Sequence, residues 1–286
     1  MRPEKQDDWN RRNVDFVKIH GSDDEAFAYL FEELKLAPRM KIGDIMGGYG
    51  GVSKYILKQA QALRISLDIL LSDAYKSPIA KSRTFLKPYE THQLRVTRII
   101  EDARNSSIAS NSLDAVIIKL GLHEFPKAHQ PQALAESHRT LKPACAIYII
   151  ESVTKTSEMN YPYRAIIRKK DELAGYTQMA QNRYFSSREE IIEALRSSGF
   201  KEIKQIYSGI FKLNTKTFCD AYMGGDPDKL QEFNEYLRSF PEDVKLALNF
   251  EDRGNDIEFS VEKVIIKAVK KSEIRWSSNL HDIIIN

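Results

Sequence analysis

The sequence feature that most constrains the fold is an alternation of short apolar segments with helix-like segments between residues 40 and 150. The apolar segments have the length of strands and lie at 40–45, 65–71, 94–100, 113–120 and 146–150. Residues 52–63 and 130–141 show the apolar spacing of amphipathic helices. Because each connection between parallel strands needs a crossover, the alternation predicts a doubly wound α/β fold with helices on both faces of a mostly parallel sheet.

The chain after Glu151 has a different character. Residues 152–186 carry several tyrosines among charged residues and little strand pattern, which predicts a helical lid above the carboxyl edge of the sheet. A sixth strand is expected to begin near Lys201, and the apolar residues 261–269 predict a seventh, antiparallel strand that pairs with the sixth. Between these two strands, residues 226–249 predict a helical insertion, with prolines near the helix starts.

The chain before the first strand is expected to hold a frayed polar tail and one helix. Ser22 and Glu25 form a capping box, which predicts an amphipathic helix that runs to about Leu36 and is ended by Pro38. The expected parts of the chain are an N-terminal tail and helix (1–36), a ligand-binding core (37–151), a lid (152–186) and the C-terminal part of the seven-stranded core (187–286).

Composition excludes several classes of function. The 286 residues carry a formal net charge of only +3 with acids and bases interspersed, so neither a nucleic-acid stripe nor a membrane-binding face is expected. The two cysteines, Cys145 and Cys219, give no metal cluster and no disulfide framework, and the histidines have no metal-ligand spacing. We see no signal peptide or membrane span, so the sequence favours a cytoplasmic protein.

The most informative local motif is residues 42–51, Ile-Gly-Asp-Ile-Met-Gly-Gly-Tyr-Gly-Gly. Its glycines after Asp44 are Gly47, Gly48, Gly50 and Gly51. A chain that leaves a buried strand and enters a helix must turn sharply, and a ligand lying against the turn leaves no room for a Cβ. The helix start then offers unpaired N–H groups to an anionic group. The motif predicts a nucleotide-type loop, although glycine turns also close ordinary βα units.

Other polar residues follow the predicted strands at the same edge of the sheet, where an open parallel sheet places its ligand. Asp73 follows the second strand, Asp102 and Ala103 follow the third, and residues 119–124 end the fourth. A carboxylate such as Asp73 can accept both hydroxyls of a ribose. Asp102 can accept from an exocyclic amine while the next backbone N–H donates to a ring nitrogen. Together these residues predict a nucleoside pocket.

These motifs resemble those of class I S-adenosylmethionine-dependent methyltransferases over residues 40–212. The resemblance extends to Ser112-Leu-Asp-Ala-Val116, Leu122-His-Glu124, Arg139-Thr-Leu-Lys-Pro143 and Ser198-Gly-Phe200. It implies S-adenosylmethionine as the cofactor, bound by Asp44, Gly47, Gly48, Gly50, Asp73, Asp102, Ala103 and Lys119. Met46 stands where the family has its first loop glycine. This difference predicts either a shifted loop or different contacts to the amino-acid end of the cofactor.

His123 is the candidate general base, because a neutral imidazole can take a proton from an attacking hydroxyl or amine. The alternative is a ring that packs beneath the cofactor, and Glu124 is as compatible with solvent as with the site. The candidate substrate residues are Tyr161, Tyr163, Tyr176 and Tyr184, which could instead pack the lid onto the sheet. The run Arg168-Lys169-Lys170 is interpreted as a solvated helix face, since Asp171 and Glu172 offset its charge.

The predicted function is methyl transfer to an oxygen, nitrogen or carbon of a small-molecule acceptor. Two alternatives stay open, because a fold does not fix chemistry. One is a methyltransferase-like enzyme that keeps the cofactor unreacted and catalyses a cyclisation or rearrangement. The other is a non-catalytic partner subunit. The helical additions at 22–36 and 226–249 could serve a homodimer interface.

Overall fold

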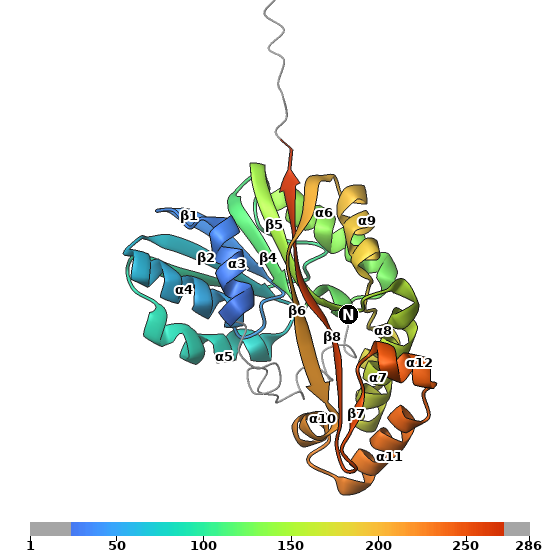
Figure 1. Cartoon of the computed structure of the whole chain (residues 1–286). Helices are drawn as coiled ribbons and strands as arrows, with labels where there is room; N and C mark the ends of the chain where they lie inside the picture. Colours follow the sequence, from blue (N-terminus) through green and yellow to red (C-terminus); the bar gives the residue numbers. More distant parts are fainter. Residues whose placement is uncertain (1–23, 272–286) are drawn as a thin grey trace, which may run out of the picture.

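The computed structural model describes residues 24–271 and is organised around one twisted sheet (Figure 1). The strands follow the order β3-β2-β1-β4-β5-β8-β6, with the short β7 paired to β8. Their bounds are β1 Met40–Ile45, β2 Leu67–Asp73, β3 Leu94–Ile100, β4 Leu113–Lys119, β5 Leu141–Val153, β6 Phe200–Asn214, β7 Glu251–Asp252 and β8 Ile257–Lys270. The strands β1 to β5 pair in parallel, and β8 lies antiparallel between β5 and β6, as the sequence predicted.

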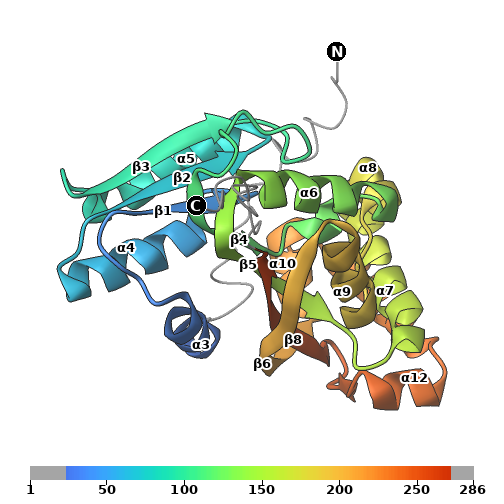
Figure 2. The same ribbon diagram turned by 90° about the horizontal axis from the view of Figure 1, so that it is seen from above.

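Helices cover both faces of the sheet. The longer ones are α3 Asp24–Leu34, α4 Gly51–Leu63, α5 Lys76–Leu86, α6 Gln130–Thr140, α7 Asn160–Leu173, α8 Thr177–Asn182, α9 Arg188–Ser197, α10 Thr215–Tyr222, α11 Pro227–Arg238 and α12 Glu242–Ala247. Short 3₁₀ turns lie at η1 Lys87–Tyr89, η2 Leu122–Glu124, η3 Lys127–His129 and η4 Ser157–Met159. Figure 2 shows α3 and α4 on one side of the sheet and α6 on the other. No helix within residues 24–271 combines the length and apolarity needed to cross a bilayer.

The central strands are apolar on both faces because each face meets a layer of helices. In β4, Ala115 and Ile117 pack with α3, α4 and α5, whereas Val116 and Ile118 pack with α6 and α9. Successive side chains of a strand point to opposite faces, so one short apolar run supplies two cores. This sandwich fixes the carboxyl ends of β1, β2 and β4 side by side.

A third apolar cluster lies beyond the sheet edge and involves the ends of β6 and β8. These two strands extend past the parallel strands as a two-stranded arm, on which α7, α8, α10, α11 and α12 pack. In Figure 1 the arm points downward, with α10 and α11 at its tip. Its core includes Phe218, Phe233 and Phe259, all nearly inaccessible to solvent. The lid is therefore held by a core of its own.

The element bounds differ from the sequence expectations in several places. The strand β5 begins at Leu141 and takes in Pro143, since α6 ends at Thr140. The helix α5 fills the crossover between β2 and β3, for which no helix range was predicted. The proposed cap at Ser22 and the tail at 1–14 lie outside the described residues.

Candidate functional site

Asp44, near the end of β1, anchors the glycine loop from beneath. Its Oδ2 accepts hydrogen bonds from the backbone N–H and hydroxyl of Ser53, at 3.0 and 2.6 Å. Its Oδ1 is fully buried and has no hydrogen-bond partner within residues 24–271. Burial raises the pKa of Asp44 to about 6, although the bonds from Ser53 and the nearby charge of Lys119 oppose the rise. One carboxylate oxygen thus remains available to a cationic ligand group.

The loop after Asp44 turns through left-handed backbone conformations. Met46, Gly48 and Gly50 have φ angles of 58°, 58° and 93°. The irregular Met46 therefore adopts the conformation that favours glycine. Gly121 from the turn after β4 accommodates its side chain, because a Cβ at Gly121 would lie 3.0 Å from the Met46 Cβ. Nothing lies within 4 Å of the position that a Cβ of Gly48 would occupy, so the loop is open there.

Asp73 ends β2 and faces the loop. Its Oδ2 accepts from the Gly48 N–H at 2.9 Å, and its Oδ1 accepts from the Tyr75 N–H at 3.0 Å. Burial raises the pKa of Asp73 to about 6 against these two hydrogen bonds. Each carboxylate oxygen keeps a lone pair, so both can still accept from a ligand hydroxyl.

Two cavities meet at Asp73. We call the first the acceptor cavity; it extends from the glycine loop under the lid and encloses about 1000 Å³, including the part open to solvent. The second, the adenine cavity, lies between the ends of β2 and β3 and is lined by Tyr75, Asp102 and Ala103. Four residues line both cavities: Met46, Asp73, Leu120 and Glu124. An elongated ligand with a ribose at Asp73 would reach into both.

Asp102 lies in the adenine cavity with both oxygens engaged by its own turn. Its Oδ1 accepts from the Arg104 backbone N–H and Nε, at 3.0 and 2.9 Å, and its Oδ2 accepts from a guanidinium N–H at 2.6 Å. Arg104 in turn lies over the Phe125 ring. The carboxylate is thereby fixed in orientation, with lone pairs left for a further donor.

His123, in η2 after β4, is held between two carboxylates. Its Nδ1 lies 2.8 Å from Glu151 Oε2 and its Nε2 lies 3.4 Å from Glu124 Oε1. The ring stacks on Phe185 with centroids 4.3 Å apart. Burial alone would lower the pKa of His123, but the charge of Glu151 and the bonds to both carboxylates raise it to about 9. At neutral pH the ring is an imidazolium.

Arg183 connects His123 and its carboxylates to the lid. Its guanidinium donates to both oxygens of Glu124, at 2.5 and 2.8 Å, and to both oxygens of Asp171, at 3.0 and 3.2 Å. Asp171 also accepts from Lys170 at 2.7 Å. We call the whole set the buried charge chain: Glu151, His123, Glu124, Arg183, Asp171 and Lys170. Acids and bases alternate along it, and its charges balance once His123 is protonated.

The buried charge chain settles one question that the sequence left open and corrects one expectation. Glu124 does not face solvent: its side chain is 11% exposed, and Arg183 and the His123 ring hold its pKa well below the usual range although burial would raise it. The basic run is not a uniform solvated face. Arg168 is exposed, but the Lys170 side chain is 3% exposed and pairs with Asp171, the next residue of α7.

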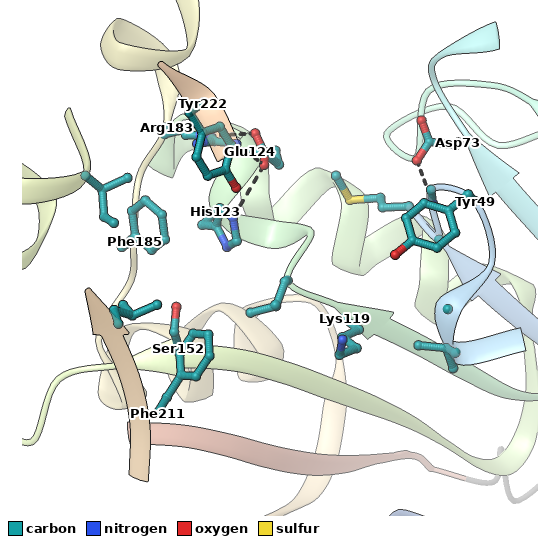
Figure 3. Close-up of a pocket in the computed structure, with 18 of the residues that line it drawn as sticks. Tyr49, Asp73, Lys119, His123, Glu124, Ser152, Arg183, Phe185, Phe211 and Tyr222 are labelled. Atoms are coloured by element: carbon teal, nitrogen blue, oxygen red, sulfur yellow. Dashed lines mark hydrogen bonds and ion pairs between the residues drawn. The ribbon is translucent and has the colours of Figure 1, made fainter. Parts of the chain in front are cut away.

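The acceptor cavity is shown in Figure 3. Phe185, Phe211 and Ser152 lie on one side of it, and Tyr49 and Asp73 lie on the opposite side, above the glycine loop. The walls on the lid side are mostly aromatic and come from α7, α10 and β6. Apolar walls with few polar groups are typical of small-molecule sites.

Comparison with known proteins identifies the fold. The family described as "Methyltransferase domain" matches residues 42–144, which include the glycine loop, Asp73 and the end of β4. The chain is also 24% identical, over 183 residues, to a ubiquinone/menaquinone biosynthesis C-methyltransferase of Dinoroseobacter shibae. That match covers 59% of this chain and 70% of the relative. These matches support the resemblance to class I S-adenosylmethionine-dependent methyltransferases that the motifs predicted.

Solved structures share the fold of this protein. The YcgJ protein of Bacillus subtilis superposes with a TM-score of 0.71 at 13% identity, over 87% of this chain and 100% of that one. A phosphoethanolamine N-methyltransferase of Haemonchus contortus, solved with S-adenosylhomocysteine, superposes with a TM-score of 0.53 at 17% identity. That match covers 89% of this chain and 54% of the nematode enzyme.

The geometry of the site suits S-adenosylmethionine. The unpartnered Asp44 Oδ1 is buried where the amino-acid end of the cofactor would lie, and the space at Gly48 is open. Asp73 lies where the acceptor and adenine cavities meet. In the cofactor the ribose joins the adenine to the amino-acid end, so a ribose at Asp73 would let each of these groups enter one cavity. The cofactor contacts of individual residues stay predictions.

The four tyrosines predicted to bind substrate lie in different places. Tyr163 lines the acceptor cavity, and its hydroxyl lies 3.0 Å from the Ser152 hydroxyl. Tyr161 is 76% exposed, and Tyr176 is buried in the core of the lid. Tyr184 donates to Glu190, and Arg164 lies over its ring. Of the four, only Tyr163 lines either cavity described here.

Sequence reasoning missed most of the acceptor side. The lining residues without a sequence signal are Ser152, Lys170, Arg183, Phe211, Leu213, Phe218 and Tyr222. They come from five separate elements or loops, so no spacing relates them. Phe185 belonged to the aromatic stretch of the lid, which was the one hint that this region faces the site.

Proposed function

We propose that this protein transfers a methyl group to a small molecule bound in the acceptor cavity. The observation that carries the proposal is that one cavity joins the glycine loop to an aromatic wall under the lid. S-adenosylmethionine supplies a methyl group on a sulfonium, which is already a good leaving group. The protein has mainly to align the acceptor and exclude water.

The residues of the cofactor half act by binding and orientation. Asp73 accepts from the ribose hydroxyls, Asp44 and Lys119 hold the two charged groups of the amino-acid end, and Asp102 with Ala103 reads the adenine edge. Gly48 leaves the loop open toward the ligand. Gly47 lines the acceptor cavity, and its missing Cβ makes room for Asp44 and Leu71. Gly50 lines neither cavity, and its missing Cβ makes room for Leu86. This assignment is supported by the lining of the two cavities.

Of the two roles considered for His123, we favour the one without base catalysis. A general base must be unprotonated, and His123 is an imidazolium with its ring nitrogens directed at Glu151 and Glu124. We assign it a positioning and electrostatic role at the acceptor, with Tyr163 and Ser152 as polar contacts of the cavity floor.

The acceptor atom is supported only by the relatives' names. The Dinoroseobacter relative is named as a carbon methyltransferase and the Haemonchus neighbour as a nitrogen methyltransferase. A cyclase or a non-catalytic subunit is not favoured, since the matching family model and the curated relative are both named as methyltransferases. We further propose that the protein acts in the cytoplasm, possesses no nucleic-acid partner and forms a homodimer through its added helices.

Isothermal titration with S-adenosylmethionine and S-adenosylhomocysteine tests the proposal, followed by mass spectrometry of products from a panel of small acceptors. We expect binding of both ligands and products heavier by one methyl group. A protein that binds neither ligand would contradict the proposal. Products of unchanged mass would favour the rearrangement alternative.

A further inference from the structure

Two hydroxyl groups lie together in the wall of the acceptor cavity. Ser152, near the carboxyl end of β5, and Tyr163, on α7, both line the cavity, and their hydroxyl oxygens lie 3.0 Å apart. The two residues are 3% and 2% exposed. Figure 3 shows Ser152 on the same side of the cavity as Phe185 and Phe211, opposite Asp73. The two hydroxyls, which we call the hydroxyl pair, therefore form a small polar spot in a largely aromatic wall.

The hydroxyl pair has one more donor hydrogen than it uses. Each hydroxyl carries one hydrogen, and only one of the two hydrogens can lie between the two oxygens. Neither hydroxyl makes another hydrogen bond within residues 24–271. The second hydrogen is thus without a protein acceptor in the described part of the chain, and a buried donor without an acceptor is costly. A ligand oxygen in the cavity would supply the missing acceptor.

The charged groups on the lid side of the cavity are already paired with one another. Lys170, Arg183 and His123 are the lining cations of the buried charge chain, and each lies against a carboxylate of that chain, at 2.7, 2.5 and 2.8 Å. The chain's lining carboxylate, Glu124, has both oxygens bound by Arg183. A charged acceptor would find no unpaired counter-ion among these lining groups, so it would lose its hydration without compensation.

The rest of the lid side is apolar. The rings of Phe185, Phe211, Phe218 and Tyr222 line it together with Leu213. Such a surface binds the apolar body of a ligand, and a flat ring makes the largest contact with it. Stacking alone leaves a ring free to turn, so the hydroxyl pair is what can fix the orientation of a bound molecule.

We propose that the acceptor is an uncharged, largely apolar molecule with a hydroxyl or carbonyl oxygen, and that the hydroxyl pair of Ser152 and Tyr163 donates a hydrogen bond to that oxygen. This inference rests on the proposed function, because the molecule shares its cavity with the cofactor. The hydroxyl pair binds and orients the acceptor and takes no part in the methyl transfer itself.

Four probes with the same ring system test the inference: 2-indanol, indane, indane-2-carboxylate and 2-aminoindane, which is protonated at pH 7. Their Kd values are measured by ligand-observed NMR titration at pH 7. The protein is used free and saturated with S-adenosylhomocysteine, which carries no sulfonium charge. We expect 2-indanol to bind best and indane to bind about fivefold more weakly, for want of the oxygen. Both ions should bind about tenfold or more weakly than 2-indanol.

Two variants locate the hydrogen bond. Ser152→Ala combined with Tyr163→Phe removes the whole hydroxyl pair, which is necessary because either hydroxyl can be the donor. Tyr148→Phe is the control: it removes a buried tyrosine hydroxyl that donates to the Glu33 carbonyl, and Tyr148 lines neither cavity. We expect the double variant to bind 2-indanol no better than indane and to keep its Kd for indane within about twofold. The control should keep the wild-type preference.

Either ion binding the wild-type protein as tightly as 2-indanol would overturn the inference. A double variant that still prefers 2-indanol to indane would overturn it as well, and so would the absence of binding by all four probes. Loss of S-adenosylhomocysteine binding would count against the proposed function instead, and the order of the probes on the free protein would still decide the inference. If the double variant does not fold, the order of the four probes on the wild-type protein decides it.

Discussion

The cofactor half and the acceptor half of this site are built in different ways. In the cofactor half, Asp44, the glycine loop and Asp73 lie within one βαβ unit, and their mutual hydrogen bonds join residues at most 25 positions apart. In the acceptor half, Arg183 contacts Glu124 across 59 positions, and β6 pairs with β8 around an insertion of three helices. The cofactor half is local in sequence, and the acceptor half is assembled by long-range packing.

This difference explains where each half is vulnerable. The local half depends on backbone conformations and on single carboxylates, so a substitution there should affect ligand binding more than folding. The other half buries six charged side chains that neutralise one another. Loss of one such charge leaves its partners unpaired in a medium of low polarity, which costs folding free energy.

The largest expected effect is that of Arg183→Met. This change leaves Glu124 and Asp171 buried without their shared guanidinium, and we expect the free energy of unfolding to fall by about 3–5 kcal/mol. Urea denaturation measures the change. The control Arg168→Met removes an exposed pair with Glu172 and should cost less than about 0.5 kcal/mol. Equal losses in the two variants would show that the buried charge chain does not stabilise the lid.

The next largest effect concerns the cofactor half. Asp73→Asn keeps the shape of the side chain but removes the charge that would accept from ribose hydroxyls. We expect the Kd for S-adenosylhomocysteine to rise about tenfold to hundredfold, as for lost hydrogen bonds to a charged group. The control is Asp68→Asn. Asp68 lies on β2, as Asp73 does, and the change breaks only its surface pair with Arg95, so Kd should stay unchanged. An unchanged Kd in Asp73→Asn would remove Asp73 from the cofactor site.

The pH dependence of cofactor binding is a second test of the cofactor half. Burial raises the pKa values of Asp44 and Asp73 to about 6, and their ionised forms are the ones that accept from the ligand. Affinity for S-adenosylhomocysteine should therefore increase between pH 5 and 7 by about tenfold for each carboxyl, or about hundredfold for the two together. Titrations in buffers of different ionisation enthalpy should detect proton release on binding near pH 6.

The folding stability of the free protein should change with pH in the opposite direction to the cofactor affinity. A raised carboxyl pKa means that the native state binds the proton more tightly, so the free protein should lose stability as pH rises from the ordinary value of 3.8 to about 6. His123 acts at higher pH, because its raised pKa gives stability that is full below 6.5 and lost as pH passes about 9. An affinity that does not vary from pH 5 to 7 would contradict the assignment of the two aspartates.

The smallest expected effect is at Met46. Met46→Gly relieves a left-handed backbone strain of about 1 kcal/mol but adds freedom to the unfolded chain, so stability should change by less than about 1 kcal/mol. Met46→Val should cost more, because a β-branched side chain fits a φ of 58° poorly. Met40→Val, in the extended strand β1, is the control. If Met46→Val were as stable as the wild type, backbone preference would not be what sets the loop.

Much of the cofactor half could be predicted because its signals are local. The end of β3 at Ile100 was predicted to the residue. Met46 illustrates the limit of the same reasoning: the sequence marked it as irregular, but the structure was needed to find its left-handed backbone and the space left by Gly121.

The acceptor half resisted prediction for a physical reason. Lys170 appeared in a mixed-charge run typical of a solvated helix, and its burial follows from the position of Asp171 and Arg183 after the lid has folded. His123 was expected to be neutral, and its protonation follows from Glu151 and Glu124, of which Glu151 lies 28 positions away. A charge state depends on the field of all its neighbours, and no spacing in the sequence encodes that field.

The sequence by itself determined the alternating α/β architecture, the glycine loop and the acids that end the strands, because apolar periodicity and backbone preference act over a few residues. The tertiary structure decided the extent of the β6–β8 arm, the aromatic wall and the balance of the buried charges. These depend on which distant side chains exclude water together, and that is settled only when the whole chain has packed.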